Sequence, residues 1–180
     1  IGSVAVKDAT LTATGLGIAA VFMQVAVSGP VSFTDVVATS YNNVFNLGSG
    51  SLTGSVSFDN VTATATGAGR GLIAEGGITA GASVAISGGS FSGDTQGIYC
   101  TAVDAATAIT ISGVTAASTA KGAIRFVAVA GAVSLSGCVL TSSAAANSAL
   151  GVAGVISAPF SISDSTLTGT AYNAFSVSSV

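Results

Sequence analysis

A nine-residue segment that recurs seven times constrains the fold of this chain more than any other feature. The copies align without gaps, and they begin 24 to 28 residues apart, about 26 on average. A period of roughly 20 to 50 residues is typical of solenoids, in which each repeat buries its apolar face against the next. The copies are VAVKDATLT from Val4, VSFTDVVAT from Val31, VSFDNVTAT from Val56, VAISGGSFS from Val84, ITISGVTAA from Ile109, VSLSGCVLT from Val133 and FSISDSTLT from Phe160.

The first three positions of the segment predict a β-strand. The first and third positions are apolar in every copy, from Val4 and Val6 to Phe160 and Ile162, and the second is always small. This alternation indicates a strand with one buried face. Hairpin strands reverse direction and do not place like residues opposite each other in every repeat. The constant columns therefore favour parallel strands stacked at about 4.8 Å.

The fifth position of the segment predicts a bend at the same place in every repeat. Only Asp, Asn and Gly occur there, and these residues tolerate a left-handed backbone or close a tight turn. We refer to this set as the turn column. Its members are Asp8, Asp35, Asn60, Gly88, Gly113, Gly137 and Asp164.

Two further strands are expected in each repeat. The sixth and eighth positions after the bend are mostly apolar or small, as in Val36 and Ala38, which indicates a second short strand. A third apolar stretch follows a Gly/Ser/Thr-rich connection, and its last copy, NAFSV from Asn173, includes Phe175 and Val177. The sequence thus predicts an all-β, right-handed parallel β-helix of about seven coils, with three short strands per coil, as a single domain over residues 1–180.

The composition argues against several other classes of protein. Charged residues form 6% of the chain and the net charge is −3, so there is no basic region for nucleic acid. No uninterrupted apolar stretch approaches the roughly 20 residues of a spanning helix, and we expect no membrane insertion. The 49% content of hydrophobic residues argues against disorder.

No group of residues indicates catalysis, a cofactor or a metal. The chain lacks His, so no ordinary base can activate a serine and no Cys/His set can bind zinc. Asp35 and Asp59, one coil apart, are the carboxylates expected to come closest, and turn formation explains both. Cys100 and Cys138 fall two coils apart and are interpreted as small core residues. We therefore expect that the protein is not an enzyme.

These repeats resemble those of the right-handed parallel β-helices of the pectin-lyase-like superfamily. They are similar in style to repeats in autotransporter passengers and in surface or adhesin-like proteins. The resemblance covers the whole chain at the level of fold. Enzymes of this superfamily are polysaccharide lyases and hydrolases, so the resemblance also implies a carbohydrate-binding or carbohydrate-active alternative. Such a groove normally offers stacking aromatic side chains, and Tyr41, Tyr99 and Tyr172 are scattered along the sequence.

The ends of the predicted solenoid suggest a structural function. Soluble solenoids cover their open strand edges with polar caps, and no cap is evident beside Val4 and Val6 or beside Phe160, Ile162, Phe175 and Val177. A second copy joined directly would place its Val4 24 residues after Phe160, within the observed spacing. We expect a head-to-tail homopolymer that forms an extracellular or cell-surface filament. The alternative is a spacer or adhesive segment of a longer surface β-helix, covered by neighbouring coils.

Two weaker motifs add further alternatives. The seventh and ninth positions carry a Thr pair in three of the seven copies, as in Thr62 and Thr64, and outward Thr ladders resemble those of ice-binding β-helices. Thr also simply favours exposed strand positions. Asn60-Val61-Thr62 is a glycosylation sequon, which applies only if the protein is secreted by a eukaryote.

Overall fold

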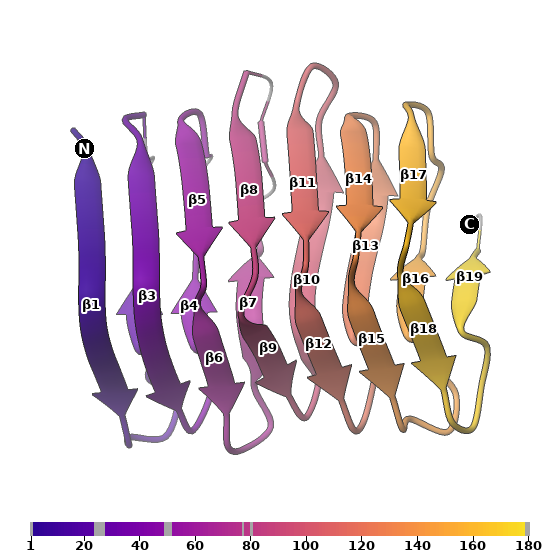
Figure 1. Ribbon diagram of the computed structural model, residues 1–180, viewed down its shortest axis with the longest axis horizontal. Coiled ribbons are helices and arrows are strands. Elements are labelled where there is room, and N and C mark those ends of the chain that lie inside the picture. Colours follow the sequence, from indigo (N-terminus) through magenta and orange to yellow (C-terminus); the bar gives the residue numbers. More distant parts are fainter. Residues whose placement is uncertain (1, 24–27, 49–51, 77, 80, 179–180) are drawn as a thin grey trace.

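The chain forms a right-handed parallel β-solenoid. The computed structural model describes residues 2–23, 28–48, 52–76, 78–79 and 81–178. The chain descends along one face, ascends along the opposite face and advances toward the C-terminus with every turn (Figure 1). All strand pairs of the described residues are parallel. The predicted fold class is therefore confirmed.

The described strands belong to two sheets, of twelve and seven strands. The twelve-stranded sheet comprises β1 (Val4–Ala13), β3 (Val31–Ser40), β5 (Ser55–Asp59), β6 (Thr62–Ala65), β8 (Ser83–Ser87), β9 (Ser90–Gly93), β11 (Ala108–Ser112), β12 (Thr115–Ser118), β14 (Ala132–Ser136), β15 (Val139–Ser142), β17 (Phe160–Ser163) and β18 (Thr166–Gly169). The seven-stranded sheet comprises β2 (Val21–Phe22), β4 (Phe45–Asn46), β7 (Arg70–Ala74), β10 (Gln96–Val103), β13 (Ile124–Val129), β16 (Leu150–Val152) and β19 (Phe175–Val177).

The strand register follows the repeat alignment. The first apolar column pairs in unbroken order, from Val4 opposite Val31 to Val133 opposite Phe160. After the bend, the pairing from Thr10 opposite Val37 to Val139 opposite Thr166 keeps the same register. Like residues therefore stack on like residues, as the constant columns predict.

The structure refines two details of the prediction. Three strands per coil occur from β5 onward, but β1 and β3 each run through the bend as one strand. Their pairing passes over Asp8 and Asp35, so the bend remains while the strand is not interrupted. Between Val4 and its equivalent Phe160 the described chain completes about six turns, rather than the predicted seven coils, because seven stacked layers are separated by six steps.

The inward columns form one continuous apolar core. In the middle layers the first, third, sixth and eighth positions of the segment are almost fully buried, except at Gly89, as for Val56, Phe58, Val61 and Ala63 at 0–1% exposure. Phe58 is at the centre of an aromatic group, since its ring centroid lies 5.2 Å from those of Phe33 and Phe45 and 5.9 Å from that of Phe91. Each layer thus gains its core contacts from the layers on either side.

Candidate functional site

The turn column adopts a left-handed backbone at all seven of its positions. The φ angle lies between 49° and 63° from Asp8 to Asp164. The bend also links adjacent layers, because its backbone N–H donates to the carbonyl of the residue before the bend of the next layer. Asn60 donates to Ser87 at 2.8 Å, and Gly113 donates to Ser136 at 2.9 Å. The Asp, Asn and Gly residues therefore serve a structural turn in every coil.

The carboxylates at and beside the bend accept hydrogen bonds from neighbouring layers. The Asn60 amide donates to the Asp35 Oδ1 at 2.8 Å, and the Ser87 hydroxyl donates to the Asp59 Oδ1 at 2.7 Å. Asp59 stands opposite Thr34 in the ladder, so it is not stacked on Asp35. Each of these two carboxylates thus accepts a hydrogen bond that ties one layer to the next. The side chain of Asn60, in the predicted sequon, is exposed.

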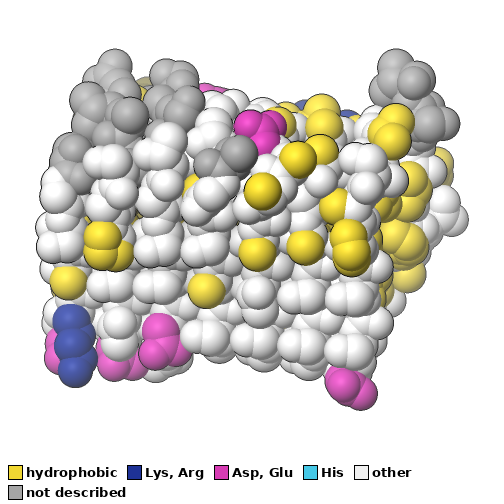
Figure 2. Space-filling model, turned by 90° about the horizontal axis from the view of Figure 1, so that it is seen from above, with side chains coloured by type: hydrophobic (Ala, Val, Ile, Leu, Met, Phe, Trp, Pro, Cys, Tyr) yellow, Lys and Arg dark blue, Asp and Glu magenta, His cyan; other side chains and the backbone are white. Residues whose placement is uncertain are grey.

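The two ends of the described solenoid present core columns at the surface. At the N-terminal end Val4 is 37% exposed and Val6 is partly buried. At the C-terminal end Phe160 and Ile162 are partly buried, whereas Phe175 is 41% and Val177 50% exposed. Figure 2 shows hydrophobic side chains gathered on the C-terminal end of the rod, at right. Residues that are buried inside the stack are therefore uncovered in its terminal layers.

Aromatic stacking continues to the C-terminal end. The Phe160 ring lies 6.1 Å from that of Phe126 and 6.2 Å from that of Phe175, with Phe160 and Phe175 inclined by only 17°. Phe175 stands opposite Leu150 and Val177 opposite Val152, in the register of the interior layers. The terminal layer thus has the geometry of an interior layer but lacks a following layer among the described residues.

The outward face of the strands after the bend carries the predicted Thr columns. Thr12, Thr39 and Thr64 stack in register, and the same column continues through Ser92, Ala117, Thr141 and Thr168. Neither this ninth-position column nor the seventh-position column beside it contains a charged residue. The three tyrosines lie in different layers, because Tyr99 stands opposite Ile73 and Arg125, and they do not form an aromatic row.

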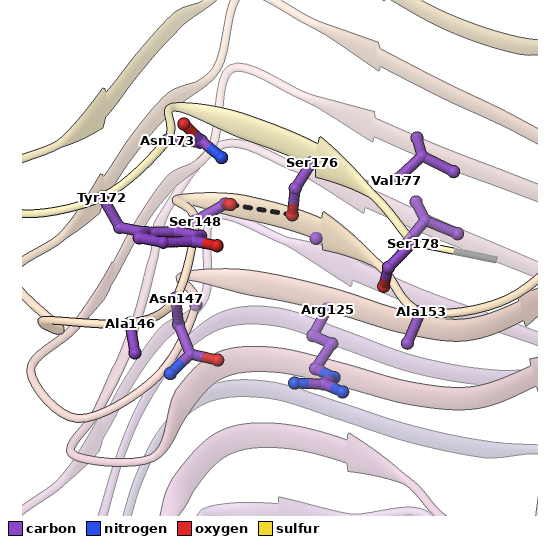
Figure 3. A pocket seen from close by; sticks show the side chains of 13 residues that line it. Arg125, Ala146, Asn147, Ser148, Ala153, Tyr172, Asn173, Ser176, Val177 and Ser178 are labelled. Atoms are coloured by element: carbon purple, nitrogen blue, oxygen red, sulfur yellow. Dashed lines mark hydrogen bonds between the residues drawn. The ribbon is translucent and has the colours of Figure 1, made fainter. Parts of the chain in front are cut away.

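A cavity that the sequence did not predict lies on the outer face of the seven-stranded sheet, near its C-terminal end. Its volume is about 320 Å³. Figure 3 shows Arg125, Asn147 and Tyr172 around the cavity, with the hydrogen bond from Ser148 to Ser176 along one wall. That hydrogen bond measures 2.7 Å between the two hydroxyl oxygens. Arg125 points outward because its neighbours Ile124 and Phe126 both face the core at 0% exposure.

The two arginines of this sheet have different surroundings. Arg70 donates from Nε to the Gln96 Oε1 at 2.6 Å, and its guanidinium lies 4.8 Å from the centre of the Tyr99 ring. Among the described residues, the Arg125 side chain forms no hydrogen bond or ion pair. Nothing in the sequence distinguishes Arg70 from Arg125 in this respect.

The cysteines are free and buried, on different layers, as the repeat register predicts. Burial raises the pKa of the Cys100 thiol to about 12. Cys138 follows the bend residue Gly137, and its backbone N–H donates to the Ser165 hydroxyl oxygen at 3.0 Å. Within the described ranges, no three His, Cys, Asp or Glu side chains come together as a metal site. The same ranges contain no helix of the length and apolarity that a membrane span needs.

Comparison with known proteins does not assign this chain to a family. A scan of family models, a search of curated proteins and a search of solved structures each returned no match.

Proposed function

We propose that this protein is structural rather than catalytic, and that copies stack head to tail through their solenoid ends to form an extracellular or cell-surface filament. The observation that carries the proposal is the exposure of core columns in both terminal layers. A following copy in the same register would place its Val4 over Phe160 and its Val21 over Phe175, so each end would receive apolar partners. Such a contact joins two different surfaces and does not close into a ring.

The strand edges favour the same contact. Within the described residues, β17, β18 and β19 each pair on one side only, as do β1 and β2 at the other end. Unpaired N–H and C=O groups on a flat edge readily add another strand. Parallel stacking of a second copy would satisfy these groups in three strands at once. The low charge of the chain, 6% Asp, Glu, Lys and Arg, leaves little repulsion to oppose it.

The alternative occupant of each end is a neighbouring coil of a longer surface β-helix, in which this segment would act as a spacer or adhesive element. The same exposed columns favour this arrangement, since coils of one chain would cover them equally well. The two proposals differ in whether the isolated chain polymerises.

Electron microscopy of the purified chain tests the filament. We expect fibres with a layer spacing of about 4.8 Å and a subunit rise of about 34 Å, which is the height of seven layers. Val177→Lys places a charge on the end face and should abolish the fibres. Val139→Lys is the matched control, because Val139 is similarly exposed, 45% against 50% for Val177, but lies on the lateral face of an interior layer. Monomeric wild-type particles would overturn copy stacking and favour the longer solenoid.

A further inference from the structure

The cavity beside Arg125 has the charge of an anion-binding site. Arg125 is the only charged residue among the described residues that line it, so none of these lining residues is a carboxylate. A guanidinium matches a carboxylate with two parallel hydrogen bonds. Arg70 on the same sheet forms a hydrogen bond with Gln96 and lies over the Tyr99 ring. An arginine without such contacts is therefore not a general property of this surface.

The remaining polar groups of the cavity suit hydroxyl groups on the ligand. The amides of Asn147 and Asn173 offer both donors and acceptors, and neither amide is hydrogen-bonded to another described residue. Tyr172, at 51% exposure, adds a hydroxyl and a flat ring at the rim. Figure 3 shows the polar ends of Arg125, Asn147 and Tyr172 directed toward the same space.

The hollow exists because a glycine replaces an outward side chain in the layer after Arg125. Gly151 stands opposite Arg125 in the ladder, and Ser176 follows in the next layer. A Cβ added at Gly151 would meet only the Ser176 Oγ, at 3.8 Å. Space for a side chain therefore remains on the outer face between Arg125 and Ser176.

We propose that this cavity binds a small polyhydroxylated carboxylate. Its carboxylate is held by Arg125, and its hydroxyl groups bind Asn147, Asn173 and Tyr172. The cavity volume of about 320 Å³ fits a ligand of this size. The cavity opens on the outer face of the sheet, whereas stacking uses the end of the last layer, and Val177 belongs to both surfaces.

Equilibrium dialysis with isotope-labelled gluconate tests the site on the full chain, below the concentration at which fibres form. We expect saturable binding that unlabelled gluconate displaces more effectively than sorbitol, which lacks the carboxylate, or acetate, which lacks the hydroxyl groups. Arg125→Gln should weaken binding about tenfold, the loss typical of a charge-assisted hydrogen bond. Lys121→Gln removes the same charge from an exposed neighbouring position and should leave the affinity unchanged.

A second variant tests the space itself. Gly151→Leu fills the hollow and should abolish binding while the melting temperature stays at the wild-type value. The proposal is overturned if wild-type protein retains no label, if Arg125→Gln binds as wild type does, or if Lys121→Gln loses as much affinity as Arg125→Gln. Unchanged binding by a folded Gly151→Leu variant would overturn it equally.

Discussion

The interior and terminal layers of this solenoid contain the same kinds of residue in the same register, yet they differ in what covers them. Phe58 in β5 is 1% exposed, whereas Phe175 in β19 is 41% exposed. In a solenoid each repeat contacts only its neighbours, and stability is close to a sum of repeat and interface contributions. Within the described residues a terminal layer has one interface fewer, so its side chains contribute less to the stability of this solenoid.

The largest expected effect compares these two phenylalanines directly. Phe58→Ala should reduce the free energy of unfolding by about 3–5 kcal/mol, because it leaves a cavity within the Phe33, Phe45 and Phe91 group. Phe175→Ala should cost about 1 kcal/mol, since much of the side chain is already in water. Urea unfolding of the monomeric chain measures both. Equal losses would show that the terminal layer is covered as fully as the interior.

A pair of glycines extends the comparison to the backbone. Gly89 and Gly17 have similar left-handed φ angles, 74° and 77°, but a Cβ at Gly89 would collide with the Val61 backbone whereas one at Gly17 meets nothing within 4 Å. Gly17→Ala should therefore cost about 1 kcal/mol from the φ angle alone. Gly89→Ala should cost about 3 kcal/mol or more, because the layer below must move. Thermal unfolding of the two variants gives the difference, and similar melting temperatures would contradict it.

The interior should also show a pH dependence that arises from Cys100. Burial raises the thiol pKa from 9.0 to about 12, so the native state holds a proton that the unfolded chain releases. The stabilisation is complete below pH 9 and is lost as the pH rises toward 12, at about 1.4 kcal/mol per pH unit. Cys100→Ala should remove this slope from urea unfolding measured between pH 8 and pH 10. A slope that persists in the variant would assign the effect to another group.

The smallest expected effect concerns charge at the proposed joint. Head-to-tail stacking would bring Asp164 next to Asp8 of the following copy, because both belong to the turn column. Two such charges in water repel by about 1 kcal/mol at 4 Å, and salt screens the repulsion. Asp164→Asn should lower the critical concentration for fibres a few-fold and reduce its salt dependence. Glu75→Gln, an exposed site away from the ends, is the control for net charge, and sedimentation measures both.

The repeat alignment predicted the register of the twelve-stranded sheet because each bend and strand depends on residues within one nine-residue segment. Asp8, Asn60 and Gly137 differ chemically but share the tolerance for a left-handed backbone, and this requirement is local. The sequence predicted the inward residues of the third strand less precisely. Its inward residue is third in NVFNL, at Phe45, but second in GLIAE, at Leu72, because the connections before it vary in length.

The cavity could not be predicted from the sequence for two reasons. It depends on the missing side chain of a glycine, and its lining residues are distant from one another in the chain. Gly151 reads as one small residue among many, and only the ladder places it beside Arg125. Tyr172 reaches the cavity from the connection before β19, two layers away from Arg125. The partners of Arg70 are likewise found only from the strand pairing, because Gln96 and Tyr99 lie in the next layer.

The constant register of the turn column has a consequence for how such a chain can change in length. Removing residues 84–108 would bring Ile109 onto Val56 and Gly113 onto Asn60, which preserves an apolar contact and a left-handed bend. Duplicating the same stretch would preserve them too. Recombination between repeats could therefore alter the rod in steps of one layer, about 4.8 Å each, whereas an insertion within a nine-residue segment would shift its strands out of register.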